Sequence, residues 1–141
     1  MRYLTEQARE QATAATAAFF EQADESFTQT RQRLISYLIK LNHALNEDLV
    51  DLSQALLSRF CDSLVDYLSA GHFRVFQRLA LLPREYAAIE ATTEAAMSFN
   101  DRFGNVRDVD LAALKSGLER IARVLSTRFE LEDELLLGDE A

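Results

Sequence analysis

The sequence predicts an all-α protein, an antiparallel up-down four-helix bundle, and three observations lead to that prediction. Only four glycines and one proline occur in 141 residues, so the backbone has few places to turn sharply. The chain is rich in Ala, Leu, Glu, Gln and Arg, which lose little entropy in a helix. Its apolar residues, 48% of the total, recur at helical spacing almost throughout. The length suits one domain, expected over residues 1–141.

A first helix is predicted by a seam of apolar residues: Phe20, Phe27, Leu34, Leu38, Leu41 and Leu45. The polar stretch 23–26 can interrupt this seam, so the helix is either broken or extended toward the N-terminus. Residues 1–23 are accordingly a helical extension or the first part of this helix, and residues 24–137 form the bundle itself.

A second helix is expected from Asn46, whose side chain can cap its first amides, with Glu47 and Asp48 near its positive end. Gly71 can bend this helix without ending it. Its buried side is predicted to carry eight apolar residues: Leu49, Leu52, Leu56, Phe60, Leu64, Leu68, Val75 and Leu79.

A third helix is predicted over residues 84–102. Pro83 separates it from the second helix, because Leu82 before a proline is pushed out of the helical region while the proline itself fits a first helical turn. Small side chains allow this helix to pack closely against a neighbour: Ala87, Ala88, Ala91, Ala95 and Ala96.

A fourth helix follows the turn signal of Gly104 and Asn105, and Asp108 is its expected cap. Its seam has spacings of three, four, three and four: Leu111, Leu114, Leu118, Ile121 and Leu125. Gly138 is expected to end it. Short connections make successive long helices antiparallel neighbours, which completes the up-down bundle.

The charge balance favours a protein partner over direct contact with nucleic acid. Fifteen basic and 23 acidic residues give a net charge of −8, which a phosphate backbone repels. An acidic surface attracts basic proteins, including those that themselves bind nucleic acid; plain solubility is the alternative explanation of the charge.

Cys61 is the only cysteine, which excludes an intrachain disulfide and, without a signal-peptide pattern, favours the cytoplasm. No apolar run is long enough to cross a membrane.

The most informative segment is the middle of the second helix. Asp62, Asp66, Ser69 and Phe73 are spaced four, three and four residues apart, so they share a mostly polar helix face. A phenylalanine on such a face can anchor a partner, while the aspartates pair with its arginines or lysines. The alternative is that Phe73 packs under a neighbouring helix and the aspartates are merely solvated.

No catalytic, cofactor or metal site is expected. The two histidines, His43 and His72, are too few for a di-iron centre, so a degenerate hemerythrin-like bundle is only an alternative, and His72 is expected to pack in the core. Arg128 and Glu132, four residues apart, are interpreted as a pair on the helix surface. Cys61 has no neighbouring histidine, and no glycine-rich phosphate loop, nucleophile elbow or zinc spacing occurs. The sequence therefore predicts a non-enzymatic binding protein.

Three blocks of sequence stand out together. The longest covers residues 60–73 and reads FCDSLVDYLSAGHF, and SFNDR at 98–102 and TRFELED at 127–133 follow it. In sequence and in order these blocks resemble the Rsd/AlgQ family of bacterial anti-sigma regulators. With a looser match near residues 30–34, the resemblance covers roughly residues 24–137.

The resemblance implies a four-helix bundle that binds, one to one, the C-terminal domain of the primary sigma factor. That domain is a basic helix-turn-helix module that reads the promoter −35 element and docks on core RNA polymerase. The resemblance assigns Asp66, Ser69 and Phe73 as contacts, with Asp62 on the same face. Some members also bind HPr of the phosphotransferase system.

Overall fold

The computed structural model describes residues 26–104 and 110–140, with the backbone alone at residues 73, 74, 78 and 138–140. Residues 1–23, predicted to be an extension or the first part of the first helix, lie outside the described residues. Over the described ranges the chain is helical apart from short connections, and it contains no strand there.

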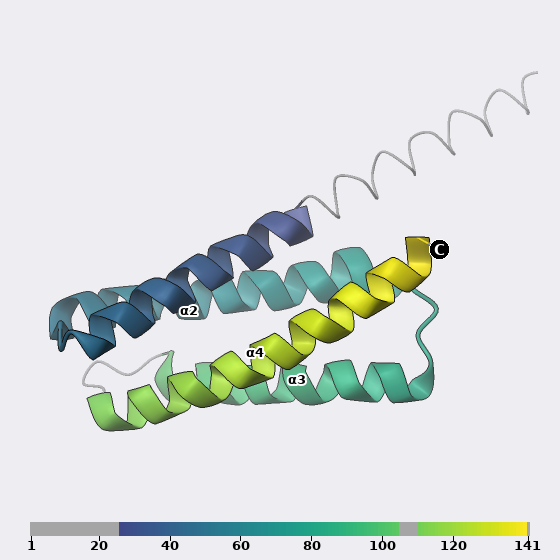
Figure 1. The fold of residues 1–141 in the computed structure, drawn as a ribbon. Coiled ribbons are helices and arrows are strands. Elements are labelled where there is room, and N and C mark those ends of the chain that lie inside the picture. Colours follow the sequence, from purple (N-terminus) through teal and green to yellow (C-terminus); the bar gives the residue numbers. More distant parts are fainter. Residues whose placement is uncertain (1–25, 105–109, 141) are drawn as a thin grey trace, which may run out of the picture.

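The described residues form four long helices. The first is described over residues 26–46, and α2 (Val50–Ala70), α3 (Pro83–Phe103) and α4 (Leu111–Glu140) follow. A π-helical turn, η1 (Gly71–Val75), and a short 3-10 helix, η2 (Phe76–Arg78), extend α2. Figure 1 shows successive helices running in opposite directions, which confirms the predicted antiparallel four-helix bundle.

The first helix ends in a Schellman motif, a left-handed residue that turns the chain and satisfies the last carbonyls. Asp48 has a φ of 57°, in the left-handed region that aspartate tolerates better than most residues. The amide of Leu49 donates to the carbonyl of Ala44 at 3.0 Å, and that of Asp48 to Leu45 at 3.2 Å. The prediction that Asn46 caps the second helix is therefore wrong. Asn46 is the last residue of the first helix, and α2 starts only after Leu49, without a side-chain cap.

Gly71 marks the point where α2 widens into η1. A Cβ atom at this position would lie 3.1 Å from a ring carbon of Phe76 and 3.2 Å from one of Phe27, tighter than most real contacts. The glycine therefore lets two aromatic rings pack directly against the backbone. The helix changes its winding at Gly71 but does not end there, as predicted; the backbone becomes extended only at Leu79.

The connection into α3 follows the prediction closely. Leu82 is extended, with φ −68° and ψ 152°, and Pro83 is the first residue of α3. The amide of Leu82 donates to the Glu85 carboxylate at 2.8 Å, which satisfies a group that the helix leaves unpaired. The helix runs one residue further at each end than residues 84–102 and finishes at Phe103.

The ends of α4 differ from those predicted. The carboxylate of Asp110 accepts a hydrogen bond from the amide of Ala112 at 3.0 Å and so caps the helix start. Asp108, the predicted cap, lies outside the described residues. Gly138 does not end the helix, which continues to Glu140; glycine inside a helix lowers stability but does not forbid the helical conformation.

The core lies among the helices, and α2 enters it through a face rotated from the predicted one. Leu49 and Leu52, predicted to be buried, are 45% and 49% exposed. Ser53, Leu57 and Tyr67 are buried instead. The rest of the predicted seam is buried or partly buried: Leu56, Phe60, Leu64, Leu68, Val75 and Leu79. None of the helices in the described part of the chain combines the length and hydrophobicity that a membrane crossing requires.

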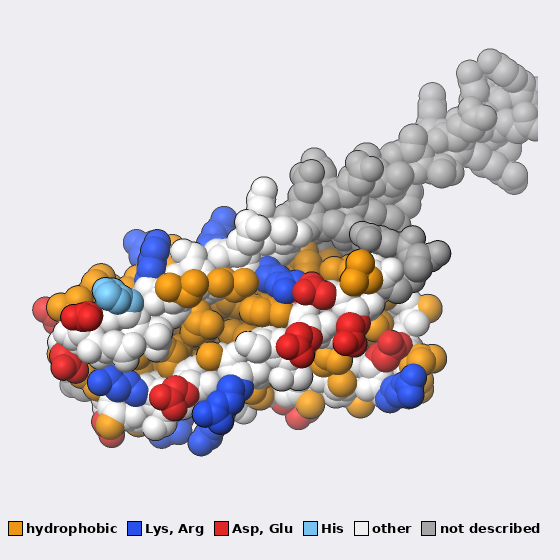
Figure 2. Space-filling model, in the orientation of Figure 1, with side chains coloured by type: hydrophobic (Ala, Val, Ile, Leu, Met, Phe, Trp, Pro, Cys, Tyr) orange, Lys and Arg blue, Asp and Glu red, His pale blue; other side chains and the backbone are white. Residues whose placement is uncertain are grey.

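Apolar side chains also reach the surface between the first helix and α4. Figure 2 shows them along the line where these two helices face each other. Leu38 and Ile39 from the first helix and Leu118 and Ala122 from α4 line a hollow of about 390 Å³ there. Arg123 and Glu119 also line this hollow, so its rim carries both charges.

Candidate functional site

Three of the four residues predicted to bind a partner lie exposed on α2. Asp62, Asp66 and Ser69 are spaced four and three residues apart, so they share one side of this helix, which we call the α2 acidic face. Phe73 follows in η1, where the wider π turn changes the helical register. The Phe73 side chain lies outside what the structure describes, so its role as an anchor stays a prediction.

Two further exposed side chains border the α2 acidic face. Arg59 precedes Asp62 by three residues, and Val65, 40% exposed, lies next to Asp66 in the chain. The face thus offers two carboxylates, one guanidinium, a hydroxyl and some apolar surface. Such a mixture, with carboxylates in excess, suits contact with a basic protein surface.

Tyr67, on the opposite side of α2, anchors that helix in the core. Its side chain is fully buried, and its hydroxyl donates a hydrogen bond to Oε2 of Glu132 on α4. Its ring stacks on Phe27 of the first helix with centroids 5.7 Å apart, and Phe129 of α4 meets it edge-on at 5.6 Å. The position of α2 is therefore fixed from the side opposite to the acidic face.

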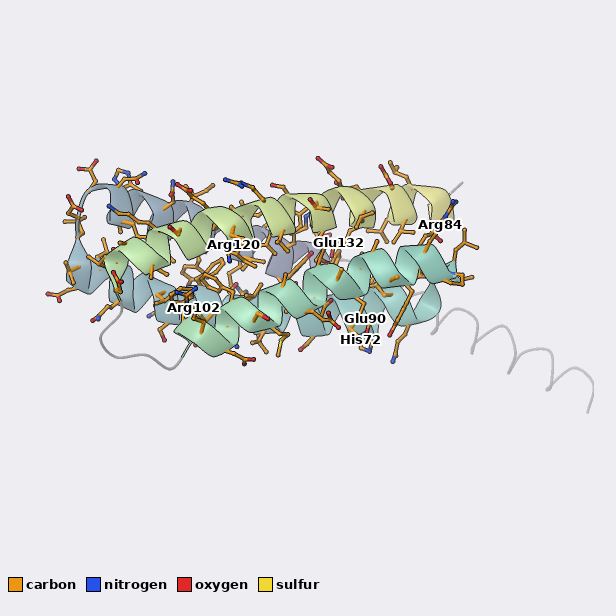
Figure 3. All side chains as sticks on the ribbon, turned by 90° about the horizontal axis from the view of Figure 1, so that it is seen from below. His72, Arg84, Glu90, Arg102, Arg120 and Glu132 are labelled. Carbon is orange, nitrogen blue, oxygen red and sulfur yellow. The ribbon has the colours of Figure 1, made fainter. Side chains whose placement is uncertain are left out.

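Arg128 and Glu132 form a buried pair rather than the predicted surface pair. Their side chains are 1% and 0% exposed. Nε of Arg128 donates to the Glu132 carboxylate at 3.3 Å and to the Tyr67 hydroxyl at 3.2 Å. Figure 3 shows Glu132 on the side of α4 that faces the other helices. The seam spacing gives the reason, since steps of three and four from Leu125 lead directly to these two residues.

Arg128 also reaches α3. Its Nη1 atom donates to the hydroxyl of Thr93 at 2.6 Å, to that of Thr92 at 3.2 Å and to the carbonyl of Ile89 at 3.4 Å. Both threonine hydroxyls in turn donate to that carbonyl. We call this set the buried polar cluster: Tyr67, Thr92, Thr93, Arg128 and Glu132.

The first helix meets the edge of this cluster through Arg31. Its guanidinium donates two hydrogen bonds to the Asp133 carboxylate, at 2.6 and 3.2 Å, and lies 4.4 Å from the centre of the Phe129 ring. Its Nη1 atom is 3.9 Å from Oε1 of Glu132, an oxygen without a hydrogen-bond partner among the described residues. Polar contacts thus link all four helices at one level of the bundle.

The protonation of the cluster follows from its burial. Burial raises the pKa of Glu132 to about 6, although the hydrogen bond from Tyr67 and the charge of Arg128 oppose this change. Burial and the charge of Glu132 also raise the pKa of Tyr67, so its hydroxyl stays a donor. At the exposed edge, the hydrogen bond from Arg31 lowers the pKa of Asp133.

The buried polar cluster lies beneath the junction of α2 and η1. The Arg128 guanidinium is 5.5 Å from the centre of the Phe76 ring in η2 and 5.4 Å from that of Tyr67. A Cβ atom at Gly71 would lie 3.5 Å from Nη2 of Arg128. The same arginine therefore packs against Tyr67, which precedes η1 in the chain, and against Phe76, which follows it. Phe73 lies within η1.

The whole sequence was compared with known proteins. The family model described as "Regulator of RNA polymerase sigma(70) subunit, Rsd/AlgQ" matches residues 6–138. The chain belongs to the Rsd/AlgQ family. Among similar proteins, the "Regulator of sigma D" of Yersinia pseudotuberculosis is 30% identical over 131 residues, which cover 82% of this chain and 78% of that protein.

Two other Rsd/AlgQ relatives match over shorter stretches. The "Regulator of sigma D" of Yersinia enterocolitica is 34% identical over 99 residues, which cover 60% of this chain and 59% of that protein. The protein of that name from Escherichia coli O139:H28 is 35% identical over 103 residues, 64% of this chain and 65% of its own length. No solved structure matches the chain significantly. The region matched by the family includes both the α2 acidic face and the buried polar cluster.

The histidine and cysteine side chains of this Rsd/AlgQ chain lie outside the buried polar cluster. His72 is exposed, so the prediction that it packs in the core is wrong. Within the described ranges, no three His, Cys, Asp or Glu residues are placed to hold a metal ion. Cys61 is buried, and burial together with the charge of Asp62 raises the pKa of its thiol to about 11.

Proposed function

We propose that this protein is an anti-sigma regulator that works in the cytoplasm by binding rather than by catalysis. It binds the basic C-terminal helix-turn-helix domain of the primary sigma factor in a one-to-one complex. The bound domain is then kept from promoter −35 DNA and from core RNA polymerase. Membership of a family described as regulators of the sigma(70) subunit supports the class of partner.

One observation carries the choice of surface: Asp62 and Asp66 are exposed together on α2, while Tyr67, on the opposite side of the same helix, is held in the core. A rigid helix that presents two carboxylates needs no rearrangement to meet arginines and lysines of a DNA-reading surface. The net charge of −8 adds long-range attraction toward such a basic domain.

Phe73 is the proposed apolar anchor beside the carboxylates. It lies in η1, immediately after α2. Arg128 packs against the ring of Phe76, which follows this turn, and lies near Gly71, which begins it. An aromatic side chain near the middle of an interface commonly contributes more to binding than the charges at its rim. Ser69, exposed between Asp66 and Phe73 along the chain, supplies a hydroxyl for a hydrogen bond.

Calorimetric titration with the purified C-terminal domain of the primary sigma factor tests the proposal. We expect binding at a ratio of one, weakened by added salt. Asp66→Lys and Phe73→Ala should each weaken it by more than about 1 kcal/mol, roughly fivefold in Kd. Glu130→Lys is the matched control, because it makes the same charge change at an exposed position of α4.

Two outcomes would count against this reading. If Asp66→Lys and Phe73→Ala both bind the domain like the control, another surface makes the contact. If the wild-type protein does not bind the sigma domain but binds HPr in a parallel titration, its partner is HPr and not the sigma factor that family membership suggests.

A further inference from the structure

A small hollow between α3 and α4 differs in charge from the rest of this acidic protein. It has a volume of about 160 Å³ and lies between the C-terminal part of α3 and the N-terminal half of α4. Among the residues that the structure describes, two arginines line it, Arg102 from α3 and Arg120 from α4, and no carboxylate does. Two other hollows differ from it, because each is lined by an arginine together with glutamate: Arg84 with Glu85 and Glu134 in one, and Arg123 with Glu119 in the other.

The floor of this hollow, which we call the arginine niche, is apolar. Phe99 and Phe103 lie there with ring centroids 4.9 Å apart, and Ile121 and Val124 come from α4. Gly117 makes the close approach possible, because a Cβ atom at that position would lie only 2.7 Å from the Phe103 ring. Phe99 and Phe103 are nearly fully buried, so they hold the shape of the floor.

The rim of the arginine niche is cationic and available. Both arginines are exposed, and neither forms an ion pair with any residue that the structure describes. The guanidinium of Arg102 lies 5.1 Å from the centre of the Phe103 ring, which holds the charge at the edge of the apolar floor. Figure 3 places Arg102 on α3 and Arg120 on the neighbouring α4. Arg120 precedes Glu132 by twelve residues on α4, which corresponds to about 18 Å at the helical rise.

We propose that the arginine niche docks an acidic protein segment that carries one apolar side chain. The volume of the niche suits one apolar side chain, because about 150 Å³ accommodates a benzene ring, whereas sites for small molecules usually exceed about 300 Å³. The charge decides what flanks it, since two guanidinium groups bind carboxylates with directed hydrogen bonds. This partner is opposite in sign to the one proposed for the α2 acidic face, and the two surfaces use different helices.

Three peptides and amide NMR of the full-length protein test the proposal. The first peptide is acetyl-Glu-Asp-Phe-Asp-Glu-amide; the second replaces Phe by Ser, and the third replaces all four acidic residues by Lys. We expect the first to shift the amides of Ser98, Gly117 and Val124, and the other two to bind at least about tenfold more weakly.

Substitutions in the protein test separately whether peptide binding needs the two arginines and whether it needs the open hollow. The double variant Arg102→Glu and Arg120→Glu should bind the first peptide at least about tenfold more weakly than wild type. Arg33→Glu with Arg84→Glu is the control, since it changes the net charge equally at exposed positions outside the niche and outside the α2 acidic face. Ser98→Leu keeps both arginines but fills the niche, and it should also lose binding.

Three results would overturn the proposal. The first peptide could fail to bind at millimolar concentration, or the peptides with Phe and with Ser could bind equally well. The variant with Arg102→Glu and Arg120→Glu could also bind the first peptide like wild type while circular dichroism shows that it is folded. Sigma-domain titration of the same variants is independent of this outcome, because it reports on the α2 acidic face.

Discussion

The guanidinium of Arg128 and the carboxylate of Glu132 lie 3.3 Å apart inside the bundle, with 1% and 0% of their side chains exposed. Removing two charges from water costs several kcal/mol, which their attraction offsets only when further hydrogen bonds satisfy both groups. Tyr67 from α2 and Thr93 from α3 supply such bonds. Because these partners come from different helices, only one relative placement of α2, α3 and α4 satisfies the pair.

Removal of the arginine alone should therefore be severe. Arg128→Met leaves the buried Glu132 with only the more distant Arg31 as a cation, and we expect a loss of about 3–5 kcal/mol in the free energy of unfolding. Urea denaturation of the full chain measures it. Arg123→Met, at an exposed position of the same helix, should change stability by no more than about 0.5 kcal/mol.

The double variant Arg128→Met with Glu132→Leu extends this test. It removes both charges and fills the space with apolar groups, so it should recover at least half of the loss caused by Arg128→Met. If the double variant is as unstable as the sum of the single ones, the two side chains do not act as a pair.

The same glutamate makes stability depend on pH. Its pKa rises from 4.5 to about 6 on folding. Between these values the folded protein binds more protons than the unfolded chain, so this group's contribution to stability is present at low pH and is lost as the pH rises toward neutrality. A shift of this size corresponds to about 2 kcal/mol.

Comparison with Glu132→Gln isolates this contribution. The free energy of unfolding of wild type relative to the variant should fall by up to about 2 kcal/mol between pH 4.5 and pH 7. Asp133, whose pKa is lowered by Arg31, acts in the opposite direction at lower pH and cancels in the difference. Glu130→Gln is the matched control, because it makes the same substitution at an exposed position of the same helix. A difference that stays constant with pH would mean that Glu132 does not change its proton affinity on folding.

The sequence predicted the bundle but not its polar interior, and α4 shows why. Apolar spacing identifies its buried side as far as Leu125, where the next two seam positions are charged. A reading based on hydrophobicity assigns Arg128 and Glu132 to the surface, because charged residues are rarely buried. The two residues are buried because side chains on other helices, such as Tyr67 and Thr93, form hydrogen bonds with them. The spacing of residues within one helix does not reveal such partners. The continued spacing of three and four was the one available signal.

The α2 acidic face was easier to predict, because it depends on spacing within a single helix. Asp62, Asp66 and Ser69 lie away from the side that carries Leu64, so their exposure follows from the helix itself. The turn before α2 was harder. Aspartate takes the left-handed position that glycine usually fills, and Asp48 therefore gave no sign that the first helix ends there.

Gly71 should resist substitution although its backbone is helical. Its φ of −62° suits alanine, which normally stabilises a helix by about 1 kcal/mol relative to glycine. Contact of the new methyl group with the Phe76 and Phe27 rings, at 3.1 and 3.2 Å, should more than cancel that gain. We expect Gly71→Ala to lower stability by about 1 kcal/mol in thermal unfolding, whereas Ser58→Ala, exposed on α2, should be neutral or slightly stabilising. Equal behaviour of the two variants would show that the rings move aside.

Cys61 should react slowly with thiol reagents while the protein is folded. Its thiol is buried, and burial followed by the charge of Asp62 raises its pKa to about 11, so at pH 8 very little thiolate is present. Labelling with a disulfide reagent should be at least about 100-fold slower in the folded protein than in urea, from the thiolate fraction alone. Because burial is the larger cause, Asp62→Asn should change the folded rate by less than about threefold. A much faster rate in that variant would mean that the charge of Asp62, rather than burial, is the main protection of the thiol.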